Sequence, residues 1–250
     1  MIKLGRIAYV NMAPVYYRLQ AEVEEVTGVP TELARKLLAG EVDVAAIPSI
    51  EFARHAAELE MLPRLCVASD GAVDSIQLVS STPPEQLRRI AVTPESATSV
   101  ALARILFPQA AQVPLGEEAP GKLLIGDAAL RSAFEDPTPH YDLGRLWRVR
   151  SGLPMVFAVW AYRKGAGAGM HELEEALLAS VKAAHAEPEL LAKQASETYG
   201  YPAGFLARYF EKLRYDFGPR EREGLLAFYK LACEAGVLER VPELAPSAAA

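Results

Sequence analysis

The chain alternates short apolar runs with runs of helical periodicity, and this alternation limits its fold more than any other feature. Residues 2–10 and 42–47 are rich in apolar and β-branched residues typical of strands, and residues 31–39 and 50–55 have the pattern of helices. Strands that alternate with helices in this way form parallel sheets. The sequence therefore predicts an α/β protein, in which ligands bind where strands end and helices begin.

The first such junction contains Tyr9, Asn11 and Pro14. Pro14 is tolerated in the first turn of a helix, so Asn11 is expected just after a strand and just before a helix. Unpaired N–H groups at a helix start can hold a ligand there. Asparagine is also common in turns and caps, so position alone leaves a structural role and a binding role equally open.

A second junction follows residues 42–47, a run apolar enough for a strand buried on both faces. Ser49 is predicted as the N-cap of a helix over residues 50–55, just as Thr31 is predicted to cap the helix that ends at Gly40. A capping hydroxyl at the carboxyl edge of a sheet can also contact a ligand.

Residues 93–99 form the third junction, where hydroxyl groups gather before a helix over residues 97–106. Ser96 is the expected N-cap, and a helix start at Thr93 is the competing register. One cap needs one hydroxyl, yet Thr98 and Ser99 add more. Either this is a well-capped helix with extra hydroxyls, or it is a site for a carboxylate.

A fourth junction joins the strand-like residues 122–126 to a helix. Asp127 could cap that helix, act as a base, accept a hydrogen bond or repel an anionic ligand, and the sequence does not decide between these roles. Gly126 suggests that another group approaches the backbone closely.

Residues 80–85 contain Pro83 and Pro84 and form the clearest break in the chain. We expect the chain to cross there into a second lobe, and residues 155–163, the most strand-like run of the second half, to cross back. The predicted division is 1–82 for the first lobe, 83–155 for the second, and 156–250 for the returning strand and the C-terminal helices.

Charge and composition exclude several classes of protein. The chain has 250 residues, a net charge of −6 and no cluster of Lys and Arg, which argues against nucleic acid or an anionic membrane as a partner. Cys66 and Cys233 are far apart in apolar surroundings, and the four histidines lack metal-binding spacing. With no signal peptide and no apolar run of about 18 residues, the protein is expected in the cytoplasm.

Several of these segments carry a resemblance to known families. Residues 33–45 resemble the helix–Gly–Glu–strand element of type II periplasmic-binding-protein folds. Five further blocks resemble the chorismate dehydratase family of the futalosine route to menaquinone; they are residues 5–14, 47–54, 93–99, 124–130 and 152–160. Their order and their extent, from about Gly5 to Tyr162, make the resemblance specific.

The resemblance implies a two-lobed type II periplasmic-binding-protein-like fold, with the C-terminal helices packing on the first lobe. It also implies a cytoplasmic hydro-lyase that converts chorismate to 3-[(1-carboxyvinyl)oxy]benzoate and water. Neither a metal nor another cofactor is expected, and the small-molecule substrate is the expected partner of a monomer or homodimer.

The resemblance further implies which residues form the site. Asn11 and Asp127 are the catalytic candidates; the substrate-binding candidates are Tyr9, Ser49, Ser75, Ser96, Ala97, Thr98, Ser99 and Gly126. A neutral amide is a poor general base. Our hypothesis is that Asn11 orients chorismate and that a carboxylate of the substrate takes the proton, with Asp127 as the alternative base from the protein.

Three other functions remain open at this stage. The 1,4-dihydroxy-6-naphthoate synthase of the same pathway shares the fold, although Tyr9, Asn11 and Pro14 at their spacing favour the dehydratase. A solute-binding protein of this fold would normally need an export signal. A ligand-sensing module would be expected to carry DNA-binding helices or a basic patch.

Overall fold

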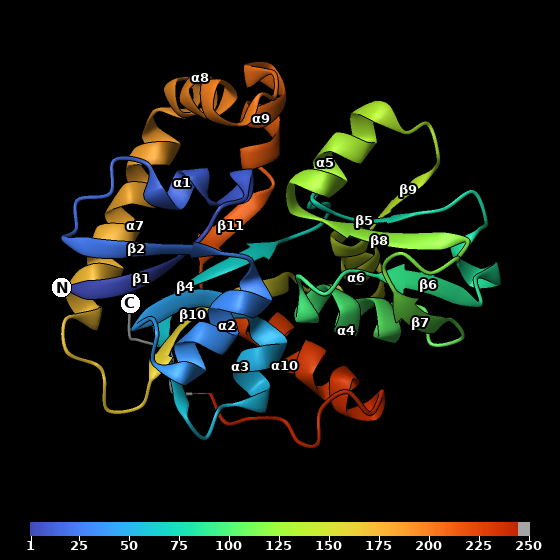
Figure 1. The fold of residues 1–250 in the computed structure, drawn as a ribbon, viewed down its shortest axis with the longest axis horizontal. Helices are drawn as coiled ribbons and strands as arrows, with labels where there is room; N and C mark the ends of the chain where they lie inside the picture. The colour runs from blue at the N-terminus through green and yellow to red at the C-terminus, as the bar shows by residue number, and fades with distance from the viewer. Residues whose placement is uncertain (245–250) are drawn as a thin grey trace.

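The computed structural model describes residues 1–244 and shows two β-sheets, each flanked by helices, side by side (Figure 1). Residues 245–250, the end of the predicted third segment, lie outside the described residues. The first sheet has six strands, in the spatial order β11 (Leu213–Asp216), β4 (Leu59–Ser69), β10 (Met155–Arg163), β3 (Val44–Pro48), β1 (Ile2–Ile7) and β2 (Val23–Gly28). It is the centre of the first lobe.

The second sheet is the centre of the second lobe. Its five strands lie in the order β7 (Ala111–Pro114), β6 (Arg89–Val92), β8 (Gly121–Ile125), β5 (Ile76–Val79) and β9 (His140–Asp142). Both sheets are mixed: β1 pairs in parallel with β2 and β3, whereas β10 runs antiparallel between β3 and β4. Strand β10 is the strand predicted over residues 155–163, and it belongs to the first sheet as expected.

Helices follow the strands in both lobes. The first lobe contains the 3-10 turn η1 (Val10–Met12), α1 (Ala13–Tyr16), α2 (Pro30–Ala39) and α3 (Ser49–Arg54). The second contains the 3-10 turn η2 (Pro84–Gln86), α4 (Ala97–Leu106), α5 (Gly126–Glu135) and α6 (Leu143–Ser151). The helix predicted over residues 97–106 is thus confirmed.

Helix α2 ends where the sequence predicts but begins at a different residue. It ends where Gly40 takes the left-handed conformation, at φ 77°, as predicted. Its start was predicted wrongly, because Pro30 is the first helical residue and Val29 precedes it. The Thr31 hydroxyl instead donates to the carbonyl oxygen of Pro94 in the second lobe, at 2.9 Å.

Four C-terminal helices complete the molecule; they are α7 (Met170–Ala186), α8 (Pro188–Tyr199), α9 (Ala203–Phe210) and α10 (Pro219–Glu234). Helix α7 packs on β4 and α1, and α10 packs on β10 and α3, so these helices cover the first lobe as expected. Helix α10 also contacts α4 of the second lobe. At Gly224 a Cβ atom would lie 2.1 Å from the carbonyl oxygen of Pro154, so α10 lies directly on the returning crossing.

The first crossing between the lobes differs from the prediction. Strand β5 pairs with β8 and β9 of the second sheet, so the chain leaves the first sheet after Ser69 and reaches the second by Ile76, before residues 80–85. Pro83 and Pro84 instead precede and begin the short turn η2 within the second lobe. A pair of prolines interrupts a strand, but it does not mark a passage between sheets.

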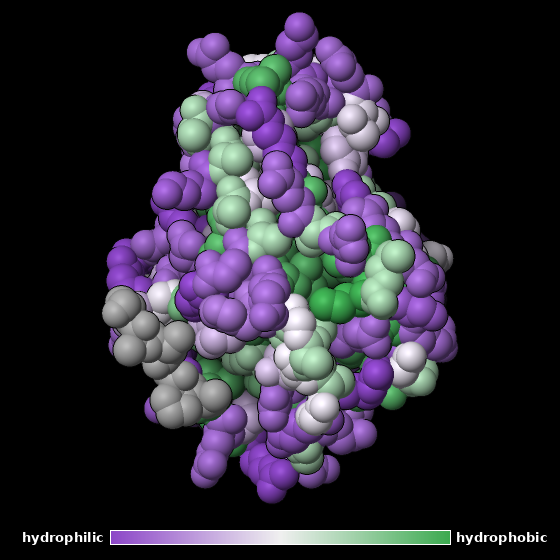
Figure 2. All heavy atoms as spheres, turned by 90° about the vertical axis from the view of Figure 1, so that its left-hand side faces the viewer, coloured by the Kyte–Doolittle hydropathy of each residue, from purple (hydrophilic) through white to green (hydrophobic). Residues whose placement is uncertain are grey.

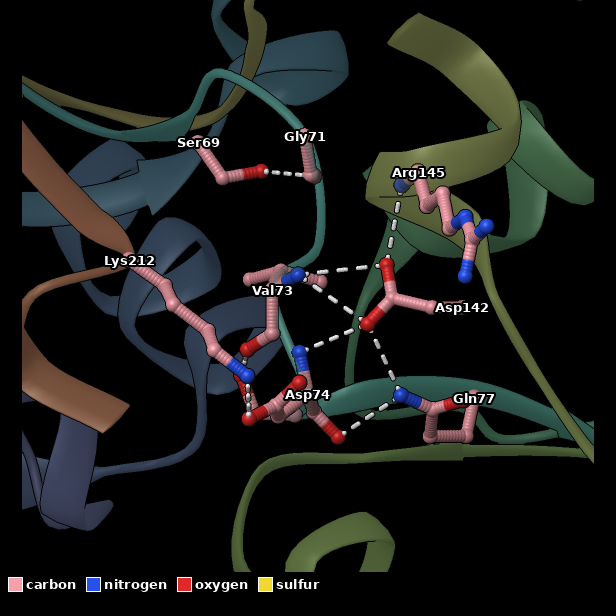
Figure 3. A network of polar contacts seen from close by, with 9 residues as sticks. Ser69, Gly71, Val73, Asp74, Gln77, Asp142, Arg145 and Lys212 are labelled. Atoms are coloured by element: carbon pink, nitrogen blue, oxygen red, sulfur yellow. Dashed lines mark hydrogen bonds and ion pairs between the residues drawn. The ribbon is translucent and has the colours of Figure 1, made fainter. Parts of the chain in front are cut away.

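Asp142 anchors this first crossing to the second lobe (Figure 3). Its carboxylate accepts hydrogen bonds from the N–H groups of Val73 and Asp74, from the Gln77 amide, and from the N–H of Arg145 at the start of α6. Burial raises the pKa of the Asp142 carboxyl, and the N–H donors oppose this effect. One side chain therefore caps a helix and fixes the crossing.

The same crossing is tied to the first lobe by Lys212, which lies between α9 and β11. Its ammonium group contacts the Asp74 carboxylate at 2.5 Å (Figure 3). Asp74 has a φ of 56°, a conformation that residues other than glycine seldom adopt. The crossing is thus held from both lobes in a defined backbone conformation.

Figure 2 shows one face of the first lobe, which is mainly hydrophilic, with small hydrophobic areas between charged and polar side chains. Within residues 1–244, no helix is both long and apolar enough to span a bilayer.

We expect Asp142→Ala to lower the free energy of unfolding by about 2–4 kcal/mol, because buried N–H donors would lose their acceptor. Urea unfolding measures the change. Asp136→Ala is the matched control, since Asp136 is exposed and its side chain accepts a hydrogen bond only from Thr138 among the described residues; its effect should stay below about 1 kcal/mol. Equal losses in both variants would contradict this role for Asp142.

Candidate active site

Asn11 lies in the 3-10 turn η1 and not directly at the end of a strand. Strand β1 ends at Ile7, so the predicted strand over residues 2–10 is too long. The side-chain oxygen of Asn11 is buried and has no hydrogen-bond partner among the described residues. Its backbone carbonyl accepts a hydrogen bond from the Tyr215 hydroxyl. The turn is therefore held by its backbone, which leaves the amide oxygen free for a ligand.

Tyr9 reaches across to the second lobe. Its hydroxyl donates to the Glu95 carboxylate at 2.7 Å, and burial together with this carboxylate raises the pKa of Tyr9. Its ring lies against Gly126, where a Cβ atom would be 2.9 Å from the ring. The close approach that Gly126 suggested is thus made by a side chain of the other lobe.

Asp127 occupies the first turn of α5, next to Gly126. Its carboxylate accepts a hydrogen bond from the N–H of Val10 at 3.1 Å, and its carbonyl oxygen accepts one from the Tyr201 hydroxyl at 2.9 Å. Burial raises the pKa of the Asp127 carboxyl, while the Val10 N–H and the charge of Arg131 oppose this effect. A carboxyl with a raised pKa is better suited to take up a proton than an ordinary one.

Ser49 does not cap α3, contrary to the prediction. It is the first residue of the helix, so its own hydroxyl donates elsewhere, to the carbonyl oxygen of Val156 at 2.8 Å. The cap is supplied by the second lobe, because Thr98 Oγ1 accepts the N–H of Ile50 at 3.1 Å. Thr98 Oγ1 also lies 3.3 Å from the Ser49 hydroxyl. The second and third predicted junctions therefore meet directly.

Ser96 is the N-cap of α4, as predicted, and the competing start at Thr93 is wrong. The Ser96 hydroxyl accepts the N–H of Ser99 at 3.3 Å and lies 2.9 Å from the Ser99 hydroxyl. Ala97, the first residue of the helix, lines a groove of about 800 Å³ together with Arg54 and Arg104.

Ser75 connects the first crossing to the fourth junction. Its carbonyl oxygen accepts the N–H of Gly126 at 2.8 Å, and its hydroxyl is buried. Gly126 has a φ of 55°, which explains why glycine is suited to this position.

The structure thus brings most of the predicted residues to one junction between the lobes. Tyr9 meets Gly126, and Ser49 meets Thr98. The hydroxyls of Ser96 and Ser99 instead pair with each other. Side chains of the two lobes thus contact each other directly at this junction.

Sequence reasoning did not identify four residues of this junction; they are Glu95, Tyr201, Tyr209 and Tyr215. Glu95 lies within the third junction but attracted no separate prediction. Tyrosines 201, 209 and 215 belong to the C-terminal region, outside the blocks that resemble the family. No local pattern distinguishes a core tyrosine from one that folds back over a site.

Comparison with known proteins shows the family to which the chain belongs. A family profile described as menaquinone biosynthesis matches residues 2–234. A protein of Thermus thermophilus named chorismate dehydratase is 34% identical over 256 aligned residues, which cover 90% of this chain and 93% of that protein. The chain belongs to this menaquinone biosynthesis family. The predicted family is therefore confirmed.

Solved structures of more distant proteins share the fold of this family member. Protein AF1704 of Archaeoglobus fulgidus matches with a TM-score of 0.78 and 18% identity, covering 95% of this chain and 98% of that one. The periplasmic aliphatic sulphonate binding protein SsuA of Escherichia coli matches with a TM-score of 0.67 and 13% identity, covering 100% and 94%. The predicted periplasmic-binding-protein-like fold is therefore confirmed.

We expect Gly126→Ala to shift this family member toward an open form, because the added methyl group would collide with the Tyr9 ring. Small-angle scattering should show a larger radius of gyration. Gly165→Ala is the matched control, since Gly165 has a φ of 82° and nothing within 4 Å of an added Cβ atom. Backbone strain should cost both variants about 1–2 kcal/mol in free energy of unfolding. An unchanged radius in Gly126→Ala would contradict direct contact between the lobes.

Proposed function

We propose that this protein is a chorismate dehydratase, a hydro-lyase that converts chorismate to 3-[(1-carboxyvinyl)oxy]benzoate and water. The observation that carries the proposal is the 34% identity, over 90% of the chain, to the Thermus thermophilus protein of that name. The junction between the lobes supports it with polar groups from both sides. The enzyme acts in the cytoplasm, on a small-molecule substrate, as a monomer or homodimer.

In the proposed reaction, the main task of the protein is to position the substrate. A proton leaves the ring carbon that bears the enolpyruvyl ether, and hydroxide leaves the neighbouring carbon. The two groups lost together make one water molecule, and the ring becomes aromatic. Because aromatisation drives the reaction, the protein has to orient the ring and place a proton acceptor beside it.

Chorismate carries two carboxylates, and the charges at the junction favour one orientation. Asp127 places a carboxyl group near Val10 and Tyr9, which disfavours a substrate carboxylate at that end. The start of α4 offers the positive end of a ten-residue helix and the hydroxyls of Ser96 and Ser99. A substrate carboxylate therefore lies toward α4, and the ring lies toward Asn11.

Asn11 orients the ring in this proposal, and a carboxylate of the substrate takes the proton. The free, buried amide oxygen of Asn11 needs a donor, and the ring hydroxyl of chorismate is one. Asp127 is the alternative base, since burial raises the pKa of its carboxyl. The lobes open to admit chorismate and close around it, which removes water from the reacting groups.

The proposed function is tested by mixing the purified protein with chorismate. We expect the ultraviolet absorbance and mass of 3-[(1-carboxyvinyl)oxy]benzoate to appear, at a rate proportional to the protein concentration. Tight binding without conversion would instead support an anion-binding protein of the same fold. If the protein leaves chorismate unchanged but converts the substrate of 1,4-dihydroxy-6-naphthoate synthase, it would instead be assigned that activity.

Two variants separate the possible proton acceptors. We expect Asn11→Ala to lower kcat/KM by about 100-fold or more, because the ring would no longer be oriented. Because Asp127 is not the base in this proposal, Asp127→Asn should lower kcat/KM less than about 10-fold. Loss of a true general base would lower it by about 10²–10⁴-fold. Asp136→Asn, at the other end of the same helix, is the control and should be unchanged.

The pH dependence of kcat/KM gives a second readout for Asp127. If Asp127 were the base, activity would rise as its carboxyl loses its proton, at a pH above the ordinary pKa of 3.8. That rise would vanish in Asp127→Asn. We expect both proteins to keep the same acid limb, because it belongs to the substrate. A limb lost in Asp127→Asn, with a rate loss above 100-fold, would assign the base to Asp127.

A further inference from the structure

The described residues contain four buried side-chain atoms without a hydrogen-bond partner; they belong to Asn11, Tyr16, Trp160 and Tyr209. A buried polar group without a partner costs about 1–3 kcal/mol. Such a group therefore calls for an explanation, and a bound ligand is one. Tyr209 is of particular interest because its hydroxyl belongs to the same junction as Asn11.

Tyr209 reaches the junction from α9. The whole side chain is buried, with an exposure of 0%, and its ring stacks on Phe205 at 6.1 Å between centroids. Burial raises the pKa of its hydroxyl; a side-chain hydrogen-bonding contact with Ser75 lowers this pKa, and the charges of Asp127 and Asp74 raise it. Tyr201 and Tyr215, on either side of Tyr209 in the sequence, donate to the carbonyl oxygens of Asp127 and Asn11, so the segment that carries Tyr209 lies beside the start of α5 and the turn η1.

Hydrogen bonds from all parts of the chain connect the residues around this hydroxyl. Gly126 donates to Ser75, Val10 donates to Asp127, and Tyr201 donates to the carbonyl oxygen of Asp127. Each of these bonds satisfies a neighbour of Tyr209, yet none uses its hydroxyl. The phenol is thus held beside Ser75, and no hydrogen bond of normal geometry includes its hydroxyl among the described residues.

The chemistry of the surroundings decides which oxygen would pair with this phenol. Tyr209 stays protonated at neutral pH, so it acts as a hydrogen-bond donor and not as a source of protons. The carboxyl groups of Asp74 and Asp127 disfavour a substrate carboxylate next to it. An uncharged oxygen fits better, and the ring hydroxyl that chorismate loses is uncharged in the substrate and receives a proton as it leaves.

On the basis of the proposed dehydratase function, we propose that the Tyr209 hydroxyl donates a hydrogen bond to the ring hydroxyl that chorismate loses. As the carbon–oxygen bond breaks, its electron pair goes to the departing oxygen, and the hydrogen bond stabilises that charge. The substrate carboxylate that took the proton from the ring passes it to this oxygen, which leaves as water. Tyr209 keeps its own proton and is a further catalytic residue of the site.

The test uses Tyr209→Phe, which removes one hydroxyl and keeps the ring that stacks on Phe205. We expect kcat for chorismate to fall by about 10- to 100-fold, since a donor to a developing oxyanion is worth up to 10²–10³-fold. KM should change less than about threefold, because the interaction strengthens in the transition state. The melting temperature should fall little, because the lost hydroxyl makes no hydrogen bond of normal geometry among the described residues.

Binding of the product distinguishes this role from a structural one. The product lacks the ring hydroxyl, so its dissociation constant, measured by calorimetry, should be the same in Tyr209→Phe and the wild type. Tyr16→Phe is the matched control, because its hydroxyl is also buried and unpartnered but its ring lies under Arg6. We expect its kcat to stay within about twofold of the wild type.

Each other outcome overturns the inference. If Tyr209→Phe turns over chorismate at the wild-type rate, the hydroxyl is not used in the reaction. If the variant binds the product more weakly, by the same factor as its turnover falls, the hydroxyl contacts another part of the ligand. An equal loss in Tyr16→Phe points to packing. If the wild-type protein does not convert chorismate, the proposed function itself is wrong. This result distinguishes failure of the proposed function from failure of the role of Tyr209 alone.

Discussion

The hydrogen bond from the N–H of Val10 to the Asp127 carboxylate joins the two lobes at the point on which the site depends. Val10 begins the turn that carries Asn11, and Asp127 lies in the first turn of α5. The bond therefore fixes the catalytic candidate of one lobe relative to that of the other. It also engages one carboxylate oxygen of Asp127 and so orients that side chain.

The C-terminal helices are part of the site and not only a cover for the first lobe. Tyr215 holds the backbone of Asn11, and Tyr201 holds that of Asp127. Tyr209, between these two tyrosines in the sequence, has a buried hydroxyl without a hydrogen bond of normal geometry among the described residues. Phe134 of α5 packs against Phe205 of α9, with ring centroids 4.8 Å apart, so these helices also meet the second lobe. Opening of the lobes must break this contact together with the polar ones.

Local patterns predicted the elements well and their partners poorly. The helix at residues 97–106 and the strand at 155–163 follow from periodicity and capping, and both are present. The cap at Ser49 was wrong because Thr98, which supplies it, is 49 residues away. The contact between Tyr215 and Asn11 spans 204 residues, and no propensity reports such a distance. Sequence patterns and family resemblance selected junctions that the fold brings into contact, while the tertiary fold alone revealed the tyrosines around them.

A crystal structure with the stable product, 3-[(1-carboxyvinyl)oxy]benzoate, tests the central claim most directly. The account predicts the product between η1 and the starts of α4 and α5, with the Asn11 amide within hydrogen-bond distance of the ligand and the lobes closed around it. A product molecule bound outside this junction, for example in the groove beside Arg54 and Arg104, would contradict it.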